Sequence, residues 1–425
     1  MNKSFKRPGN VIIVGGGIAG LMCARELLNA GNIVTILEAS DRLGGRIHTL
    51  HHPAFKEPVE KGVEFIHGNL PLTIQLLNEA DIEYKPVRGE MVRCVNGEWK
   101  TQDDFAVGWD EVIRKMNDVR DDMTMNEFLE INFSDERYIG LRRSVLRFAE
   151  GFDLADPSKA SVLALREEWM GEEGEQYRIP AGFDQLINYM NKQCLELGGV
   201  IHTSSAVTEI KWQKNDVIAK AGNQTYYGNK AIITIPLGSL QKKPIVFQPT
   251  ISSHVEAATK IGFGTVVKIL MEFKEPFWKE KKKNLGFLFT NEIIPTWWTQ
   301  LPSSYPLLTG WAGGPQAWPL QEKDESAILE LGLQSLSNVF QMPVDDLRQL
   351  LSATLVANWN NDPFTNGAYS YSFVGSTKAQ ELFNTPIEKT IFFAGEAFYD
   401  GPSRGTVEAA LVSAKNVVDR IMSGE

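Results

Sequence analysis

The chain has 425 residues and a net charge of −10, with 43% hydrophobic and 23% charged residues. This length suits two domains or one interrupted domain of ordinary globular composition. The acidic balance argues against nucleic acid as a partner and mildly favours cationic partners.

Targeting signals are not evident in the sequence. The longest apolar runs stay below the roughly 18 residues that a membrane span needs, so no membrane partner is expected. Residues 1–8 are basic but lack a signal-peptide cleavage pattern, and residues 420–425 carry no lipidation signal. Cys23, Cys94 and Cys194 are widely spaced, as reduced thiols commonly are. We therefore expect a cytoplasmic protein.

The first predicted strand covers residues 11–14, an apolar run rich in β-branched side chains. It ends in the pattern Gly15-x-Gly17-x-x-Gly20, and a helix-like stretch follows. Gly15 allows a tight turn, Gly17 lets the backbone approach a pyrophosphate, and Gly20 packs the helix against the strand. The spacing predicts a dinucleotide whose phosphates lie at the helix N-terminus, where free N–H groups and the helix dipole favour anions.

A second predicted strand, residues 33–37, closes on Glu38. An acidic residue about 20 positions into such a unit accepts hydrogen bonds from the adenosine ribose. The loop of residues 41–46 follows, and its two glycines are placed to wrap a phosphate that Arg46 neutralises. A solvated turn is the alternative interpretation of this loop.

The stretch from Val11 to Arg46 resembles the FAD-binding opening of the flavin-dependent amine oxidases, which include monoamine, polyamine and L-amino acid oxidases. NAD dehydrogenases are not expected to have the glycine–arginine loop. The residues alone predict a dinucleotide, and FAD rather than NAD is what the resemblance implies. It implies FAD contacts at Gly15, Gly17, Ile18, Ala19, Gly20, Glu38, Ala39, Arg42, Gly44, Gly45 and Arg46.

Residues 60–68 resemble the polyamine oxidase segment that passes beside the flavin into the substrate cavity. His67 falls on that family's active-site histidine, which implies that it orients or hydrogen-bonds the substrate, with Phe65 and Ile66 close to FAD. A loop histidine satisfied by the backbone is the alternative for His67. L-Amino acid oxidases hold the substrate carboxylate with an arginine near the position of Phe65, so an α-amino acid substrate is less expected.

The pattern becomes mostly helical after residue 71, with an insertion expected to cover the cofactor site. Helical periods occur at residues 72–80, 109–119, 125–131 and 136–152, and a hairpin with Asn96-Gly97 at its turn covers residues 92–99. Acidic residues are dense over residues 166–175. Such a run is most often a solvated face, and less often a funnel for cationic substrates like the entrances of polyamine oxidases.

The nucleotide-binding pattern returns after residue 180. A helix is predicted over residues 185–197, followed by strands at residues 200–202, 207–210, 217–219 and 231–236. In the family, the backbone at the position of Val207 hydrogen-bonds adenine, and the resemblance implies the same contact here.

A strand predicted over residues 264–273 carries Lys268 within an apolar run. Buried lysines are rare unless they are paired or functional, and a strand-edge lysine reaching solvent is the alternative. In the family, a lysine of a matching strand holds a water against flavin N5, which implies that role for Lys268. Its charge would also stabilise charge as oxygen is reduced.

Aromatic residues are dense in the following part of the chain. Residues 285–355 predict strands and helices of a substrate domain, and the sequence does not say which of Trp297, Trp298, Trp311 and Trp318 line a pocket. Residues 358–371 resemble the family's Trp-x-x-Asp-Pro-x-x-x-Gly-x-Tyr block, which implies that Trp359 and Tyr369 approach the flavin and the amine. Ala368 stands where monoamine oxidases carry a flavin-linking cysteine, so we expect non-covalent FAD.

The last predicted strand, residues 391–393, leads to Gly395-Glu396, and the last helix opens at Thr406-Val407. This resembles the family's closing FAD motif, which implies that Glu396 meets the ribityl or phosphate region. The helix N-terminus at Thr406-Val407 is expected to face the flavin pyrimidine and stabilise the reduced flavin anion. Residues 402–403 do not supply the second cage tyrosine of the monoamine oxidases.

These patterns predict an α/β fold, with a doubly wound, Rossmann-like FAD-binding domain and an inserted α+β substrate domain. We expect residues 1–70, 181–263 and 387–425 in the first domain, and residues 71–180 and 264–386 in the second. The alternation of segments supports this division independently of the resemblance.

The activity implied by the resemblance is FAD-dependent oxidation of a small amine. A hydride passes from the amine α-carbon to flavin N5, giving an imine or aldehyde, and oxygen becomes hydrogen peroxide. The implied catalytic residues are Lys268, His67 and Tyr369, and no metal site is expected. One alternative is a flavin dehydrogenase or desaturase of the same fold, like the protoporphyrinogen oxidases. Another is a non-enzymatic, redox-responsive FAD-binding interaction protein.

Overall fold

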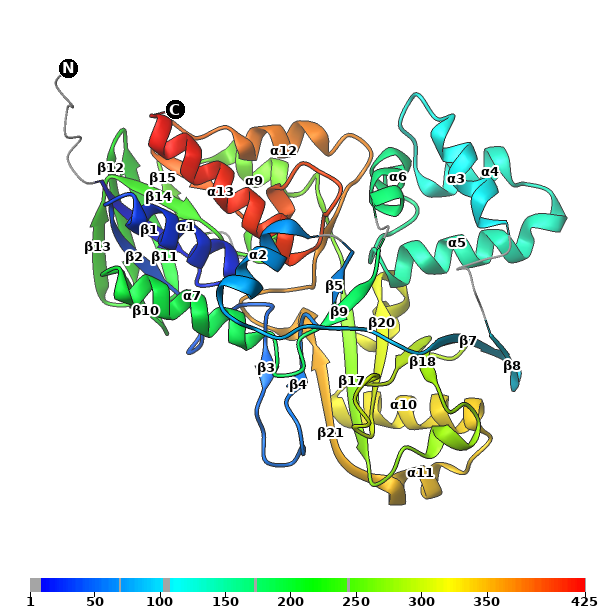
Figure 1. Cartoon of the computed structure of the whole chain (residues 1–425). Coiled ribbons are helices and arrows are strands. Elements are labelled where there is room, and N and C mark those ends of the chain that lie inside the picture. Colours follow the sequence, from blue (N-terminus) through cyan, green and yellow to red (C-terminus); the bar gives the residue numbers. More distant parts are fainter. Residues whose placement is uncertain (1–8, 69, 102–107, 172–173, 243–244, 425) are drawn as a thin grey trace.

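The computed structural model describes residues 9–68, 70–101, 108–171, 174–242 and 245–424. Figure 1 shows an α/β part on the left, a large mixed sheet at lower right and a group of helices at upper right. Within the described residues, no helix has both the length and the apolar character needed to cross a membrane.

A five-stranded parallel sheet forms the centre of the α/β part, in the order β10-β2-β1-β14-β23. Its strands come from three distant stretches of the chain: β1 Asn10–Val14, β2 Ile33–Leu37, β10 Val200–His202, β14 Lys230–Ile233 and β23 Ile391–Phe393. Alternate side chains of β1 enter different cores, because Val11 and Ile13 belong to one hydrophobic cluster and Ile12 and Val14 to another. The sheet is therefore covered on both faces, as parallel sheets generally are.

Helices cover one face of this sheet and a second sheet with further helices covers the other. The first layer contains α1 Ile18–Asn29, α2 Pro71–Glu79, α7 Asp184–Glu196 and α13 Val407–Ser423. The opposite layer contains the four-stranded sheet β13-β12-β11-β15 and three helices. Their bounds are β11 Val207–Gln213, β12 Asp216–Ala221, β13 Gln224–Gly228, β15 Val246–Gln248, α8 Leu237–Lys242, α9 Ser252–Ala258 and α12 Thr377–Asn384.

The large mixed sheet has seven strands in the order β21-β17-β20-β19-β18-β7-β8. Only β7 and β18 pair in parallel; the other neighbours are antiparallel. The strands are β7 Glu90–Val95, β8 Glu98–Thr101, β17 Val266–Phe273, β18 Leu285–Thr290, β19 Thr296–Trp298, β20 Leu307–Gly313 and β21 Leu351–Asn358. One face packs on α10 Glu325–Phe340 and α11 Val344–Leu350.

The remaining helices form a separate cluster with its own core (Figure 1). They are α3 Trp109–Asn117, α4 Met125–Asn132, α5 Ile139–Gly151 and α6 Val162–Gly171. Helix α4 begins with a capping box in which Thr124 and Glu127 each satisfy the other's backbone N–H.

Short elements connect these parts. The remaining short strands are β3 Thr49–Leu50, β4 Val59–Glu60, β5 Ile66–His67, β6 Lys85–Pro86, β9 Gln176–Arg178, β16 Gly262–Phe263 and β22 Ser370–Tyr371. The 3-10 helices are η1 Glu136–Tyr138, η2 Phe277–Glu280, η3 Gly314–Leu320, η4 Trp359–Asn361 and η5 Glu396–Phe398.

The α/β fold class predicted from the sequence is confirmed, and most predicted elements are present with small boundary differences. The hairpin turn at Asn96-Gly97 is also present, and both residues have the positive φ angles (52° and 81°) that this tight turn needs. The strand predicted to end at residue 236 stops at Ile233, and helix α8 begins soon afterwards. The predicted division into two domains stays an interpretation.

Candidate active site

A cavity of about 1140 Å³ reaches from the β1–α1 turn to the mixed sheet and the helical cluster. The three catalytic candidates, Lys268, His67 and Tyr369, all line it. Of the residues predicted to contact FAD, these also line it: Gly15, Gly17, Ile18, Ala19, Glu38, Ala39, Gly44, Gly45, Arg46, Phe65, Ile66, Val207, Trp359, Gly395, Glu396, Thr406 and Val407. Gly20 and Arg42 do not line it. The tertiary structure thus brings together motifs from the beginning, middle and end of the chain.

The β1–α1 turn depends on two close backbone approaches. Gly15 has a φ of +116°, and a Cβ there would lie 2.5 Å from the Thr234 hydroxyl oxygen. A Cβ on Gly20 would lie 2.1 Å from the Gly15 carbonyl oxygen, so Gly20 permits the helix to pack on the turn. Helix α1 has Gly17 as its N-cap, without a side-chain cap or an acidic first turn. Its first N–H groups are therefore suited to an anionic ligand such as a pyrophosphate.

Glu38 is held at the end of β2 by the backbone. Its two carboxylate oxygens accept hydrogen bonds from the N–H groups of Gly16 (2.6 Å) and Ser40 (2.8 Å). Burial raises the pKa of Glu38 above its ordinary value, although these hydrogen bonds act in the opposite sense. The carboxylate has a fixed position at the nucleotide end of the cavity, which suits the predicted ribose contact.

Arg42 braces the glycine–arginine loop. Its guanidinium donates to the carbonyl oxygens of Leu43 (3.2 Å), Gly45 (2.8 Å) and Ile47 (3.3 Å). The side chain therefore holds the loop in shape from behind, and Gly44 and Gly45 form the surface that faces the cavity.

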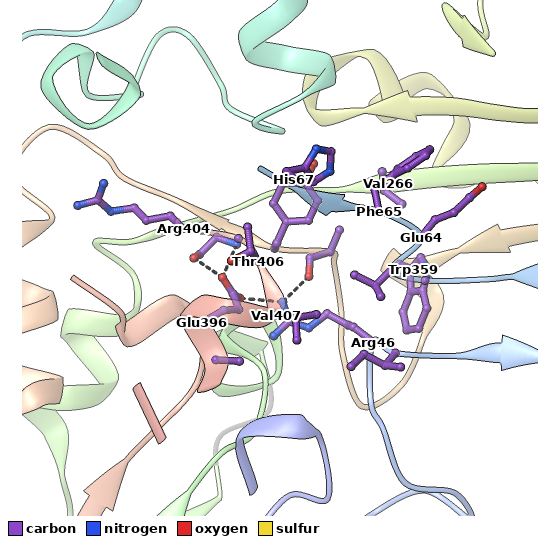
Figure 2. A pocket seen from close by; sticks show the side chains of 18 of the residues that line it. Arg46, Glu64, Phe65, His67, Val266, Trp359, Glu396, Arg404, Thr406 and Val407 are labelled. Carbon is purple, nitrogen blue, oxygen red and sulfur yellow. Dashed lines mark hydrogen bonds and ion pairs between the residues drawn. The ribbon is translucent and has the colours of Figure 1, made fainter. Parts of the chain in front are cut away.

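Arg46 and Glu396 form an ion pair in the wall of the cavity (Figure 2). The Arg46 Nη1 atom lies 2.7 Å from a Glu396 oxygen and donates to the Ala368 carbonyl at 2.6 Å. The other Glu396 oxygen accepts from the Ser370 hydroxyl at 2.6 Å. Part of the Arg46 charge is thus engaged by Glu396, which the sequence did not predict.

The N-terminus of α13 faces the cavity at Thr406 and Val407, beside Arg46 and Glu396 (Figure 2). Thr406 is the N-cap, and its hydroxyl accepts a hydrogen bond from the Ala409 N–H at 3.2 Å. The acidic residue of the first turn, Glu408, binds the N–H groups of Leu72 and Thr73 at the start of α2. The positive end of the α13 dipole therefore lies at the cavity wall, as the sequence predicts.

Lys268 lies in the interior of the mixed sheet, with 1% of its surface exposed. Its Nζ atom is 2.7 Å from a Glu64 carboxylate oxygen and 3.2 Å from the Gly62 carbonyl oxygen. The Trp298 ring centroid is 5.7 Å from the same nitrogen. Because β17 has neighbours on both sides, the alternative of a strand-edge lysine reaching solvent is wrong.

Glu64 joins two buried cations. Its carboxylate pairs with Lys268 and with the Arg178 guanidinium (3.2 Å), and accepts a hydrogen bond from the Trp298 indole (2.8 Å). Burial would raise the pKa of Glu64, but Lys268 and Arg178 lower it more, so the pKa lies below its ordinary value. The sequence analysis missed this residue, and its only signal was a charged side chain inside the segment that resembles the family.

His67 belongs to β5 and packs between aromatic rings. Its ring centroid lies 5.4 Å from that of Phe152 and 5.8 Å from that of Phe65. Burial lowers the pKa of His67 to about 4, so the imidazole is neutral near neutral pH. Among the described residues, nothing bonds its Nδ1 atom, so the backbone-satisfied alternative does not account for this nitrogen.

Aromatic side chains form much of the remaining wall. The Tyr369 hydroxyl donates to the Phe152 carbonyl, and the Trp359 indole donates to the Lys61 carbonyl at 2.9 Å. Of the four tryptophans that the sequence left undecided, Trp298 and Trp311 line the cavity. Trp297 is fully buried in the core against α10, and Trp318 is 53% exposed.

Three acidic residues of the run at residues 166–175 form ion pairs with arginines. Glu167 and Glu168 lie 3.3 Å and 3.6 Å from Arg404, and Glu175 pairs with Arg88 at 2.8 Å. Residues 172–173 lie outside the described residues. Burial raises the pKa of Glu168, a cavity-lining residue, to about 7, although Arg404 acts in the opposite sense. The sequence analysis did not single out Glu168.

No group of three or more His, Cys, Asp or Glu side chains suited to a metal ion occurs within the described ranges. The cavity is instead lined by a glycine-rich turn, two helix N-termini, an ion pair and aromatic rings. This set fits an elongated anionic dinucleotide with an aromatic ring system.

Comparison with known protein families agrees with this interpretation of the cavity. The model of a family described as flavin containing amine oxidoreductase matches residues 18–422. Polyamine oxidase 2 of Arabidopsis thaliana is 27% identical, over 98% of this chain and 89% of the relative. Lysine-specific histone demethylase 1 homolog 2 of the same plant is 28% identical, over 92% of this chain and 55% of the relative.

Solved structures share the fold. Wild-type putrescine oxidase bound to putrescine superposes with a TM-score of 0.83 at 19% identity, over 98% of this chain and 99% of that one. Cyclohexylamine oxidase from Brevibacterium oxydans IH-35A gives a TM-score of 0.81 at 19% identity, over 98% of this chain and 100% of that one.

Proposed function

The chain belongs to the family of flavin-containing amine oxidoreductases, and we propose that it is an FAD-dependent oxidase of small amines. The observation that carries this proposal is the single cavity that connects the glycine-rich turn at Gly15 with Lys268 and His67. A nucleotide site and an amine site that share one space are what oxidation of an amine by a bound dinucleotide requires.

Bound FAD would accept a hydride from the amine α-carbon and pass the electrons to oxygen, giving hydrogen peroxide. The turn after β1, Glu38, and the N-termini of α1 and α13 would hold it. Ala368 and the three buried cysteines support non-covalent binding, because none of these cysteines lines the cavity. All three cysteines are buried and form no disulfide in the structure, which supports the proposed cytoplasmic location.

The protein side chains would prepare the amine for oxidation. Neutral His67 would accept a hydrogen bond from the amine at Nδ1, and the rings of Phe65 and Tyr369 would enclose it. Glu168, with a pKa of about 7, is suited to accept the proton that an ammonium must lose. Lys268 would hold a water close to the reacting centre.

The test is anaerobic mixing of purified FAD-loaded protein with a panel of monoamines, diamines and polyamines. We expect the flavin absorbance to bleach with at least one amine, and hydrogen peroxide to form after air is admitted. Putrescine and polyamines belong in the panel because similar proteins carry those names. Absence of bleaching and of peroxide across the panel would overturn the proposal.

A further inference from the structure

Arg178 contacts the Lys268–Glu64 pair although it does not line the cavity itself. It ends β9, the middle strand of the sheet β5-β9-β6, and only 9% of its side chain is exposed. Strand β9 pairs with β5, which follows directly after Glu64 and Phe65. The Arg178 guanidinium carbon accordingly lies 4.7 Å from the centroid of the Phe65 ring. Strand pairing thus brings a buried cation to the segment that carries Glu64.

The two oxygens of the Glu64 carboxylate have different partners. Oε1 lies 3.2 Å from the Arg178 guanidinium, and it accepts hydrogen bonds from the Trp298 indole (2.8 Å) and the Gln300 amide (3.5 Å). Oε2 lies 2.7 Å from the Lys268 Nζ atom. Because a carboxylate is planar, three donors that fix Oε1 also restrict the direction of Oε2. The contacts on one oxygen therefore determine where the other oxygen meets Lys268.

The Lys268 ammonium is held at two points. Besides its contact with Glu64, it donates to the Gly62 carbonyl oxygen at 3.2 Å. An ammonium carries three N–H donors in a tetrahedral arrangement, so these two contacts also fix the direction of the third donor. Lys268 lines the cavity. The position of its charge there consequently depends on where Glu64 holds Oε2.

Arg178 is itself braced from the mixed sheet. Its Nη1 atom donates to the Gln300 side-chain oxygen at 3.0 Å, and the Gln300 nitrogen donates to the Thr309 hydroxyl at 3.3 Å. Thr309 is fully buried in β20, the strand that pairs with β17, which carries Lys268. A planar guanidinium can serve Glu64 and Gln300 together because its donors form a rigid fork.

We propose that Arg178 is a positioning residue for the reaction of the reduced flavin with oxygen, and that it acts through Glu64 on Lys268. This inference rests on the FAD-dependent oxidation proposed above. In that step oxygen takes up two electrons and one proton from the reduced flavin and a second proton from solvent, which gives hydrogen peroxide. A cation in a fixed place stabilises the negative charge that develops on oxygen, and this effect weakens with distance.

The test is a double-mutant cycle between Arg178 and Lys268, measured on the oxygen step alone. The flavin of the FAD-loaded protein is reduced by titration with dithionite, and its reoxidation by oxygen is followed by stopped-flow absorbance. We expect Arg178→Met to slow reoxidation by about threefold to tenfold in the unchanged background. In the Lys268→Met background it should slow reoxidation by less than about twofold. Equal slowing in both backgrounds, or slowing in neither, overturns the inference.

The reduction potential of the bound flavin provides an equilibrium measurement that a loss of stability alone does not move. A cation held beside the flavin stabilises the reduced anion. We therefore expect Lys268→Met to lower the potential, Arg178→Met to lower it by less, and the double variant to equal Lys268→Met. Equilibration with reference dyes measures these potentials. A potential that falls in Lys268→Met but is unchanged in Arg178→Met contradicts the proposal.

The matched control is Arg25→Met. Arg25 pairs with two carboxylates at 3.0 Å and 3.1 Å, 11% of its side chain is exposed, and it does not line the cavity. Its loss should change the reoxidation rate by less than about twofold. Flavin absorbance and thermal unfolding first establish that each variant is folded, which we expect for Arg178→Met because Lys268 and Glu64 remain as a matched pair.

Two milder variants decide the question if Arg178→Met does not fold. Trp298→Phe keeps both charges and removes only one donor to Glu64, so it should slow reoxidation only while Lys268 is present. Arg178→Lys keeps the charge without the fork and should retain part of the rate. If neither variant slows reoxidation in the unchanged background, the inference is wrong.

The outcomes also distinguish this inference from the proposed amine oxidation, because dithionite reduces the flavin without an amine. Coupling between Arg178 and Lys268 together with no bleaching across the amine panel overturns the amine oxidation and supports the positioning role. Bleaching by an amine together with an absence of coupling overturns the positioning role alone.

Discussion

The Lys268 ammonium and the Glu64 carboxylate lie 2.7 Å apart, with 1% and 7% of their side-chain surfaces exposed. Arg178 lies on the same carboxylate at 3.2 Å, so one buried anion connects two buried cations. Desolvation makes such a group costly, and loss of one member leaves an uncompensated charge. Glu64 therefore sets the position of Lys268 in the cavity wall.

Replacing Glu64 by Gln should destabilise the protein strongly, because two buried cations lose their anion. We expect a loss of about 3–5 kcal/mol, measured by chemical denaturation of the FAD-loaded protein. The matched control is Glu330→Gln, which removes a pair with Arg348 of the same 2.7 Å length on the surface. There the loss should stay below about 1 kcal/mol.

Protonation of Glu64 should lower the free energy of unfolding at acid pH. Since the pKa of Glu64 is below its ordinary value in the folded state, its contribution is present above the unfolded pKa and is lost as pH falls through the folded pKa. The Glu64→Gln variant should lose less stability than the unchanged protein below about pH 4.5. If the free energy of unfolding falls by the same amount with pH in the unchanged protein and in Glu64→Gln, this assignment is wrong.

Lys268→Met tests the role of the buried cation. In an amine oxidase of the proposed type, reoxidation of the reduced flavin by oxygen should slow by at least about tenfold, since the charge that stabilises reduced oxygen is lost. Stopped-flow mixing of reduced protein with oxygen measures this rate. Lys211→Met, which changes an exposed lysine, is the control. Unchanged reoxidation would favour the alternative dehydrogenase or desaturase.

His67→Gln should slow flavin reduction by a factor that does not depend on pH. Burial lowers the pKa of His67 to about 4, so the ring stays neutral throughout the working range of about pH 6 to 9. The rate of anaerobic bleaching, followed across this range, should fall by roughly tenfold at each pH. If the mutation removed an ionisation near pH 6.5, a protonated His67 would be the active form instead.

Glu168 should control flavin reduction near neutral pH. Its pKa of about 7 implies that the carboxylate becomes available as base only as pH rises through that value. The rise of kcat/KM with pH should therefore disappear in Glu168→Gln. Arg404→Gln should move the rise to higher pH, and Glu167→Gln to lower pH, because these neighbours shift the Glu168 pKa in opposite senses. Shifts in the same direction would refute the assignment.

Gly20→Ala should weaken FAD retention and stability together, because the new methyl would lie 2.1 Å from the Gly15 carbonyl oxygen. The α1 helix must then move away from the turn that approaches the phosphates. Bound FAD after gel filtration and the thermal midpoint provide the measurements. Gly140→Ala is the control, since a methyl there meets nothing within 4 Å. It should be neutral or stabilising by up to about 1 kcal/mol.

Local patterns were sufficient to predict the α/β fold and the nucleotide turn. The β1–α1 unit has strand periodicity, glycine spacing and the terminal Glu38 within a short stretch, so short-range physics determines its shape. The Asn96-Gly97 hairpin was predictable for the same reason. The family resemblance then placed Lys268, His67 and Tyr369 as candidates, and the cavity contains all three.

The sequence by itself determined the conformation of the glycine-rich turn between β1 and α1, because backbone conformation there follows from neighbouring residues. Only the tertiary structure decided the partners of the charges. Glu64 meets Lys268 and Arg46 meets Glu396 through strand register and the packing of separate parts. Ion pairing depends on three-dimensional proximity and burial, which no local pattern encodes. These ion pairs in the cavity wall therefore became visible only in the folded chain.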